Sequence, residues 1–430
     1  MFNENAETVI KQEPIERPLR RSPRLAELAE KKTNISQTMN FQTTSHGVYP
    51  AEVIARCIEH INACCIQTYT VKQGIRKWGN KGYSSAIKEL EQLHSRTCFT
   101  PLKLKDISRM ERKKAMEAVT FMVQKRDETV KTRMCANGST QRVWMDKEDK
   151  SSPTVSLEAL AITAALDAAE GRSIITLDIP NAFIQTIVVS DKDGDKIILI
   201  LRDEIALMLV DLDPDVYLEA LEYHKGKPVL YLHVQRAIYG MLQSALLFYE
   251  KFVKDLTEYG FKLNPYDPCV ANKTVNGEQL TIVWHVDDVK ASHEDQKVLD
   301  TFGKWVNDKY GDDKIGKVKI TRGHRHDYLG MILDFATAGE VKIDMQYYVQ
   351  AIVEDFEHEY GEFTKRGNAE TPHTATLFTV NESPTLVDKR QNDFHAYVAR
   401  ALFLCKRARP DVQPTVSFLI TRVKEPTKQD

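Results

Sequence analysis

Two hydrophobic periods recur along this 430-residue chain and predict both helices and strands. Ile87, Leu90 and Leu93 in the stretch SSAIKELEQLHSR lie three residues apart, which predicts an amphipathic helix. The same kind of pattern predicts helices within 51–70, 234–261, 345–360 and 394–423, the last divided at Arg409–Pro410. Short apolar runs at 174–179 and 280–286 predict buried strands. At this length, without visible repeats, we expect a sizeable core divided into two or three subdomains.

Both of these predicted strands end in aspartates. Asp178 ends the first, before a turn at Pro180–Asn181 into a helix. The second belongs to a hairpin that turns at Asn276–Gly277 and ends at Asp287 and Asp288. A second hairpin with a glycine turn is predicted within 326–345. An isolated aspartate pair usually marks a solvated turn, but carboxylates that end buried strands need a cation or hydrogen-bond donors.

Three carboxylates at one sheet edge would suit a hard dication. Mg²⁺ prefers carboxylate and phosphate oxygens to imidazole or thiolate. A pair of such ions can support an in-line displacement at phosphorus. The sequence therefore indicates phosphoryl-transfer chemistry at Asp178, Asp287 and Asp288.

Charge is segregated along the chain although the formal net charge is only −2. Residues 101–142 hold eleven basic and five acidic residues, and residues 191–225 hold four basic and ten acidic residues. Nucleic-acid binding would therefore have to come from a local basic patch.

The ends and the cysteines limit the class of protein further. Residues 1–48 are polar and basic and are expected to form a flexible arm, whose arginines could contact nucleic acid, act as a nuclear address or remain solvated. Seven cysteines without a CxxC pair argue against structural zinc and a disulfide scaffold. No apolar run is long enough for a membrane span or a signal core. An intracellular protein is expected, in a cytoplasmic particle or the nucleus.

The order of the motifs resembles the reverse transcriptases of Ty1/copia-type LTR retrotransposons. Asp178 is followed by Phe183, and then come AIYGMLQ, HVDD and DYLGM, in the serial order of the polymerase motifs. The resemblance extends from about residue 70 to the end and includes KRDETVKTRMCANGSTQ, SSPTVSLEAL and FLCKRARPDVQPTVSFLITRV. Several ordered motifs are far more specific than any one of them.

This resemblance implies an α+β right-hand polymerase with a palm of mixed or antiparallel sheet plus helices, fingers and a partial thumb. It implies a basic linker arm at 1–48, fingers and palm at 49–345 with the fingers at roughly 70–170, and a thumb-like region at 346–430 that ends before any RNase H. The implied function is RNA-directed DNA polymerisation, with dNTPs, an RNA template, a DNA primer or template, and two Mg²⁺ ions, for which Mn²⁺ could substitute.

The resemblance also assigns roles to single residues. Asp178, Asp287 and Asp288 match the catalytic metal ligands, and Phe183 matches the aromatic residue that excludes a 2′-hydroxyl, with a core residue as the alternative. The remaining matches are the nucleotide-helix glutamine, the basic fingers strand and the primer-grip turn, namely Gln243, Arg133, Lys131, Arg126, Lys125, Leu329 and Gly330.

Two departures from the family keep an alternative open. His285 replaces the usual tyrosine before the aspartate pair, and MLQSALLFY lacks the family's lysine and arginine. The alternative is a catalytically silent retroelement remnant that only binds nucleic acid through its basic fingers. The survival of all three aspartates favours the enzyme, whereas the missing RNase H favours the remnant. Template, primer and oligomeric state stay open.

Overall fold

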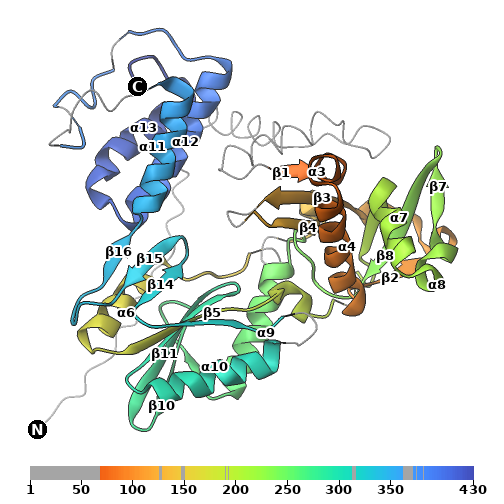
Figure 1. Ribbon diagram of the computed structural model, residues 1–430, viewed down its shortest axis with the longest axis horizontal. Helices are drawn as coiled ribbons and strands as arrows, with labels where there is room; N and C mark the ends of the chain where they lie inside the picture. Colours follow the sequence, from red (N-terminus) through yellow and green to blue (C-terminus); the bar gives the residue numbers. More distant parts are fainter. Residues whose placement is uncertain are drawn as a thin grey trace, which may run out of the picture. The chain divides into compact units, whose positions relative to one another are not determined.

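The computed structural model describes residues 68–124, 128–146, 151–188, 190–191, 193–311, 316–361, 371–373, 375–380 and 382–430. They belong to one compact unit, Asn62–Asp430. Strands among these residues form sheets of seven, six and three strands, accompanied by helices (Figure 1). This mixture confirms the α+β class. The predicted basic arm and most of the predicted helix at 51–70 lie outside the described residues.

The seven-stranded sheet combines two separate stretches of the chain. Its strands are β1 (Thr68–Thr70), β2 (Phe99–Leu102), β3 (Met116–Gln124), β4 (Val130–Ala136), β6 (Ile198–Arg202), β7 (Glu222–His224) and β8 (Lys227–Val234). The order is β1-β3-β6-β8-β2, with β4 paired to β3 and β7 to β8. Because β6, β7 and β8 follow residue 170, this sheet extends beyond the 70–170 segment expected for the fingers.

Several helices accompany this sheet, and one of them was predicted from the sequence. They are α3 (Val71–Trp78), α4 (Asn80–Ser95), α5 (Arg109–Lys114), α7 (Asp203–Leu212) and α8 (Pro214–Tyr217). In α4, Leu90 and Leu93 are buried and Ile87 packs against the same apolar cluster, which confirms the predicted helix face. Thr70 and Gln73 form a capping box that fixes the start of α3.

The six-stranded sheet carries the aspartates. Its order is β13 (Lys319–Arg322), β5 (Ser173–Asp178), β12 (Asp288–His293), β11 (Glu278–His285), β10 (Val270–Val275) and β9 (Lys262–Leu263). Every adjacent pair is antiparallel. The accompanying helices are α6 (Leu157–Ala169), α9 (Ser244–Glu258) and α10 (Gln296–Tyr310).

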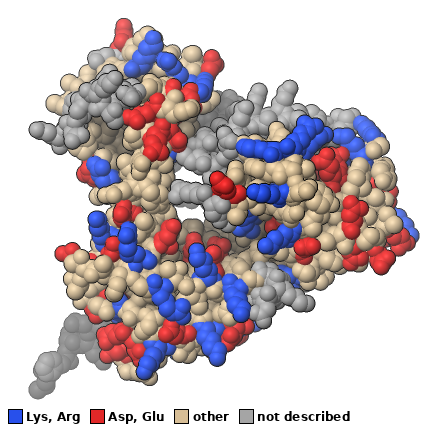
Figure 2. Space-filling model, viewed as in Figure 1, with Lys and Arg blue, Asp and Glu red and all other residues tan. Residues whose placement is uncertain are grey.

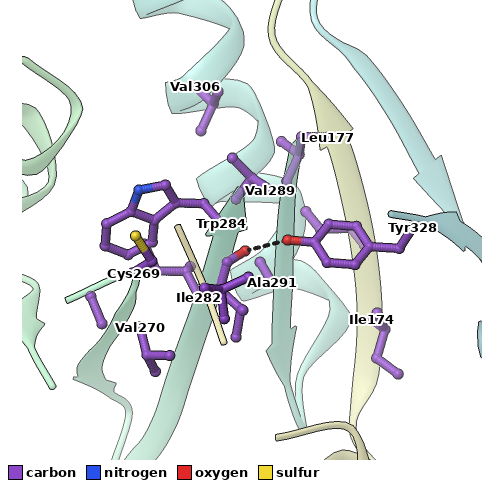
Figure 3. Packing of buried hydrophobic residues seen from close by; sticks show 14 of the residues in the cluster. Ile174, Leu177, Cys269, Val270, Ile282, Trp284, Val289, Ala291, Val306 and Tyr328 are labelled. Carbon is purple, nitrogen blue, oxygen red and sulfur yellow. Dashed lines mark hydrogen bonds between the residues drawn. The ribbon is translucent and has the colours of Figure 1, made fainter. Parts of the chain in front are cut away.

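Both faces of β5 are covered. Ile174, Ile175, Thr176 and Leu177 are all buried, so β5 reads as a continuous apolar run and not as an alternating one. Helix α10 packs on β5 and β12, and a Cβ at Gly303 would lie 3.1 Å from Ile320 Cδ1, so this close approach suits glycine. Figure 3 shows the packed side chains between these elements.

The aspartate hairpin differs in one respect from its prediction. The turn at Asn276–Gly277 is confirmed, with φ angles of 55° and 93°. However, β11 ends at His285, Val286 and Asp287 form a second two-residue turn, and Asp288 begins a further strand, β12. The sequence hides β12 because Lys290, Ser292 and His293 are polar, although each is at most 1% exposed.

The C-terminal part continues with a small sheet and three helices. These elements are β14 (Arg325–Tyr328), β15 (Met331–Asp334), β16 (Lys342–Asp344), α11 (Gln346–Tyr360), α12 (Asp388–Arg407) and α13 (Gln413–Arg422). A 3-10 helix, Pro410–Val412, separates α12 from α13, which confirms the predicted break. None of the described helices is long and apolar enough to cross a membrane. The described cysteines are free: Cys98, Cys135, Cys269 and Cys405.

Candidate active site

The fold brings the three predicted aspartates to one end of the six-stranded sheet. Asp178 is the last residue of β5 and Asp288 the first of β12, and the two are register partners. Asp287 lies in the adjoining turn, where its carbonyl oxygen accepts the Ile179 N–H at 3.1 Å. Register partners in an antiparallel pair have Cβ atoms about 5 Å apart on the same face. Asp178 is exposed, whereas Asp287 and Asp288 are half-buried.

The carboxylates repel one another in this position. Partial burial raises the pKa of Asp288 to about 6, and the negative charges of Asp287, Asp178 and Asp327 contribute further. Burial followed by the charge of Asp178 also raises the pKa of Asp287, against the opposite influence of Arg133 and His285. Such a group of carboxylates favours protons or a bound cation.

Backbone strain and one buried tyrosine fix the turn that carries Asp287. Val286 has φ 59°, which is costly for a β-branched residue, and its side chain packs against the main apolar cluster. The Tyr328 hydroxyl is within donating distance of two carbonyl oxygens, Val283 at 3.1 Å and Asp288 at 3.2 Å. Tyr328 is 2% exposed, and its hydrogen bond into the sheet is visible in Figure 3. These contacts connect Tyr328 to both β11 and β12 next to the turn that carries Asp287.

Tyr239 connects the basic strand β4 to the aspartate region. The Arg133 guanidinium lies over the Tyr239 ring at 4.7 Å from its centroid, and Phe183 meets the same ring edge-on at 4.8 Å. Burial raises the pKa of Tyr239, and the negative charges of Asp287 and Asp178 contribute, which places the tyrosine within their electric field. The sequence contained Tyr239 in AIYGMLQ, but its role was not predicted.

Gly240 explains why the chain can approach β4 at this point. The Ala136 N–H donates to the Tyr239 carbonyl oxygen at 2.7 Å. A Cβ at Gly240 would lie 2.1 Å from the Ala136 carbonyl oxygen, and its φ is 87°. Only glycine satisfies both the contact and the left-handed backbone.

Phe183 and Gln243 occupy places that differ in part from expectation. Phe183 lies in a short 3-10 helix, Ala182–Gln185, not in an α-helix, and is half-buried against both large apolar clusters. The left-handed Asn181 directly before it favours this tight turn. Gln243 is the N-cap residue that immediately precedes α9 and is not within the helix, and its side chain forms no capping hydrogen bond.

The other predicted residues divide into three groups. Lys131 lies on β4 two residues before Arg133, so both side chains share one face. Lys125 and Arg126 lie outside the described residues. Leu329 and Gly330 form a two-residue turn between β14 and β15, with φ angles of 51° and 76°, and the Tyr347 hydroxyl donates to the Gly330 carbonyl oxygen at 2.8 Å. The predicted glycine turn is therefore confirmed.

Several ion pairs join the two oppositely charged segments of the sequence in the fold. Ion pairs join Lys103 to Glu219 and Arg202 to Glu117, and Lys196 lies 3.3 Å from Glu111. Of the basic residues of 101–142, Lys103 pairs with Glu219 and Lys114 with a group of three aspartates, whereas the other two pairs join glutamates of this segment to basic residues of 191–225. Figure 2 shows lysine and arginine side chains gathered around α3 and β3 on the visible face.

One further carboxylate group lies in the seven-stranded part. In the described portion of the chain, Asp191, Asp193 and Asp195 are the group of three or more potential metal ligands whose ligand atoms lie within 4.8 Å of one another. The Lys114 ammonium lies at 2.7, 2.8 and 2.7 Å from them, and these hydrogen bonds raise its pKa. The cluster thus already contains a cation. The carboxylate oxygens of Asp178, Asp287 and Asp288 do not all lie within this distance of one another.

The comparisons with known proteins match part of this chain to one family. Residues 204–371 match the family model described as reverse transcriptase (RNA-dependent DNA polymerase). This range contains Asp287, Asp288 and Leu329–Gly330, whereas Asp178 and Phe183 precede it. The retrovirus-related Pol polyprotein from transposon TNT 1-94 of Nicotiana tabacum is 19% identical over 307 residues. The match covers 70% of this chain and 20% of the relative, so this chain spans about a fifth of that polyprotein.

Two solved structures are similar to this chain, both with low TM-scores. One is the foamy viral protease-reverse transcriptase in complex with ds DNA, which is 14% identical, with a TM-score of 0.36, over 80% of this chain and 48% of that chain. The other is the BmCPV RNA-dependent RNA polymerase at elongation state, with 10% identity, a TM-score of 0.27 and coverage of 83% and 33%. Neither score supports an argument about this chain. This chain is therefore similar to reverse transcriptases over residues 204–371 and, over a longer stretch, to a retrotransposon Pol polyprotein.

Proposed function

We propose that this chain is an RNA-directed DNA polymerase that extends a primer 3′-hydroxyl with dNTPs on an RNA or DNA template. The observation that carries the proposal is the register pairing of Asp178 with Asp288 beside Asp287, within a chain that is similar to reverse transcriptases over residues 204–371. Nucleotidyl transfer needs negative charge to be neutralised and two oxygens to be held in line. The sheet end supplies the carboxylates for this task.

The carboxylates fit Mg²⁺ as the resident cofactor. All three donors are hard oxygens, and their mutual repulsion, with the pKa of Asp288 raised to about 6, would be relieved by a dication. Asp178, Asp287 and Asp288 would hold it. When bound, Mg²⁺ would neutralise the phosphates and lower the pKa of the attacking hydroxyl. The exposed Asp178 leaves this end of the sheet accessible to a primer terminus and a triphosphate.

Side chains around the aspartates would orient the nucleotide. Arg133, stacked on Tyr239, would hold the triphosphate, because a guanidinium binds phosphate oxygens in pairs. Lys131, on the same strand face, would add positive charge, as would Lys125 and Arg126. Phe183, held edge-on by Tyr239, would exclude a ribose 2′-hydroxyl.

The remaining elements would hold the nucleic acid. Leu329–Gly330 would contact the primer strand, and Gln243 would border the nucleotide at the start of α9. We assign the six-stranded sheet to the palm, the seven-stranded sheet to the fingers and residues 346–430 to a thumb-like region. Residues 1–48 would be the basic linker arm.

A primer-extension assay tests the function. The purified chain, a labelled DNA primer on an RNA template, dNTPs and Mg²⁺ should give extended products. Asp287→Asn should abolish extension while keeping primer–template affinity, and Asp211→Asn on the exposed surface of α7 should be active. Binding without extension by the unmodified chain would replace the enzyme with the silent, nucleic-acid-binding remnant.

A further inference from the structure

A completely buried ion pair lies beneath the aspartates. The Lys290 ammonium is 2.5 Å from Asp167 Oδ2, and both side chains are 1% exposed. Lys290 belongs to β12 and Asp167 to α6, so the pair joins the aspartate-bearing strand to a helix of the same core. Neither residue was singled out from the sequence, since a lone lysine or aspartate carries no pattern.

The strand period fixes the position of Lys290 relative to the active-site residues. Lys290 follows Asp288 by two residues and therefore points to the same face, about 7 Å further along the strand. Its register partner on β5 is Thr176, which likewise lies two residues from Asp178. The pair Thr176 and Lys290 thus forms the row directly behind the pair Asp178 and Asp288.

Other polar contacts surround this second row. The Thr176 hydroxyl lies 3.2 Å from His326 Nδ1, and His326 Nε2 lies 2.8 Å from the Gly323 carbonyl oxygen. His326 is 0% exposed. The row behind the aspartates is therefore polar, buried and bonded to two further elements, α6 and β14.

Stability alone does not explain such a pair. Desolvation of two charges costs about as much as their attraction returns, so well-packed apolar residues are often equally stable or more stable. Buried charges can instead specify one alignment. Val289 and Ala291, which flank Lys290, are both apolar and would tolerate a shift of β12 by two residues. A shifted Lys290 would leave Asp167 unpaired in the core.

We propose that Lys290 and Asp167 are a positioning pair that sets the alignment of β12, and so holds Asp288 opposite Asp178. The pair contacts neither substrate nor nucleic acid and acts through the backbone of β12. This inference rests on the proposed function only for its catalytic readout. Removal of the pair should impair the carboxylate site even where the fold survives.

The test replaces both charges together. Lys290→Met with Asp167→Leu keeps side-chain volume and leaves no charge unpaired, whereas each single substitution strands a buried charge and should lower the melting temperature sharply. Lys290→Arg keeps the charge and should retain most function. Ser292→Ala is the matched control, because Ser292 is on the same strand and face, is fully buried, and its hydroxyl has no hydrogen-bond partner among the described residues.

Three measurements on each full-length variant separate positioning from folding. The double variant should melt close to the unmodified protein and bind primer–template equally well. Its kcat and its affinity for Mn²⁺, measured by electron paramagnetic resonance without nucleic acid, should each fall about tenfold or more, as when groups behind metal ligands are changed. The Ser292→Ala control should match the unmodified protein in every measurement.

Each other outcome overturns the inference. A stable double variant with normal kcat and Mn²⁺ affinity would show that the pair has no positioning role. A double variant that melts far below the unmodified protein would show that the pair serves stability alone. If the unmodified chain does not polymerise, the proposed function fails, but the Mn²⁺ and melting measurements still decide the role of Lys290 and Asp167.

Discussion

Asp288→Asn should stabilise the protein in the absence of metal while it removes polymerase activity. Asparagine has nearly the same shape as aspartic acid but carries no charge. The pKa of Asp288 is about 6 in the folded chain, against an ordinary value of 3.8, because of burial and the nearby charges of Asp287, Asp178 and Asp327. The folded state therefore binds the Asp288 proton more tightly than the unfolded state does.

The sign and size of the effect follow from this difference. Because the folded pKa is raised, the unmodified protein loses stability as pH rises from 3.8 to about 6, and the full penalty applies above pH 6. About two pKa units correspond to about 3 kcal/mol. Asp288 is only half-buried, so solvent screening reduces the expected penalty to about 1–2 kcal/mol. With an unfolding entropy of about 2 cal/mol/K per residue, removal of this penalty should raise the melting temperature of the Asp288→Asn variant by about 1–3 °C.

Thermal melts of both proteins in EDTA at pH 7.5 and pH 4 would measure this effect. The Asn variant should melt higher at pH 7.5, and most of the difference should disappear at pH 4, where Asp288 is protonated in the folded state. Added Mg²⁺ should raise the melting temperature of the unmodified protein more than that of the variant. A variant that melts lower at pH 7.5, or a difference equal at both pH values, would refute the electrostatic reasoning.

Two further substitutions test neighbouring parts of the site. Phe183→Val should increase ribonucleotide incorporation relative to dNTPs in a primer-extension assay. The substitution removes the ring that would exclude a 2′-hydroxyl, whose centroid lies 4.8 Å from that of Tyr239. An unchanged ratio would make Phe183 a core residue. Tyr328→Phe should destabilise the chain by about 1–2 kcal/mol in chemical denaturation, because the Val283 and Asp288 carbonyl oxygens lose a buried donor, while Tyr266→Phe at a 95% exposed site should have no effect.

Local signals in the sequence predicted several elements of the fold and pointed to three candidate site residues. Two features depend only on neighbouring residues and could be predicted without knowledge of the fold. They are the helix face of Ile87, Leu90 and Leu93 and the turn at Asn276–Gly277. Asp178 and the Asp287–Asp288 pair stood out because charge directly after a buried apolar run is unusual and needs compensation.

The tertiary structure alone decided how distant segments meet. The register that sets Asp178 opposite Asp288 joins strands far apart in the chain, and no local pattern encodes it. Polar β12 could not be recognised as a buried strand, because Lys290 becomes acceptable in the core only when Asp167 arrives from α6. Likewise, the charges of 101–142 and 191–225 are segregated along the sequence, and only the fold shows that some of them form ion pairs with each other, because adjacent strands and loops bring them within contact distance. Sequence therefore fixed the chemical groups, and long-range packing fixed their partners.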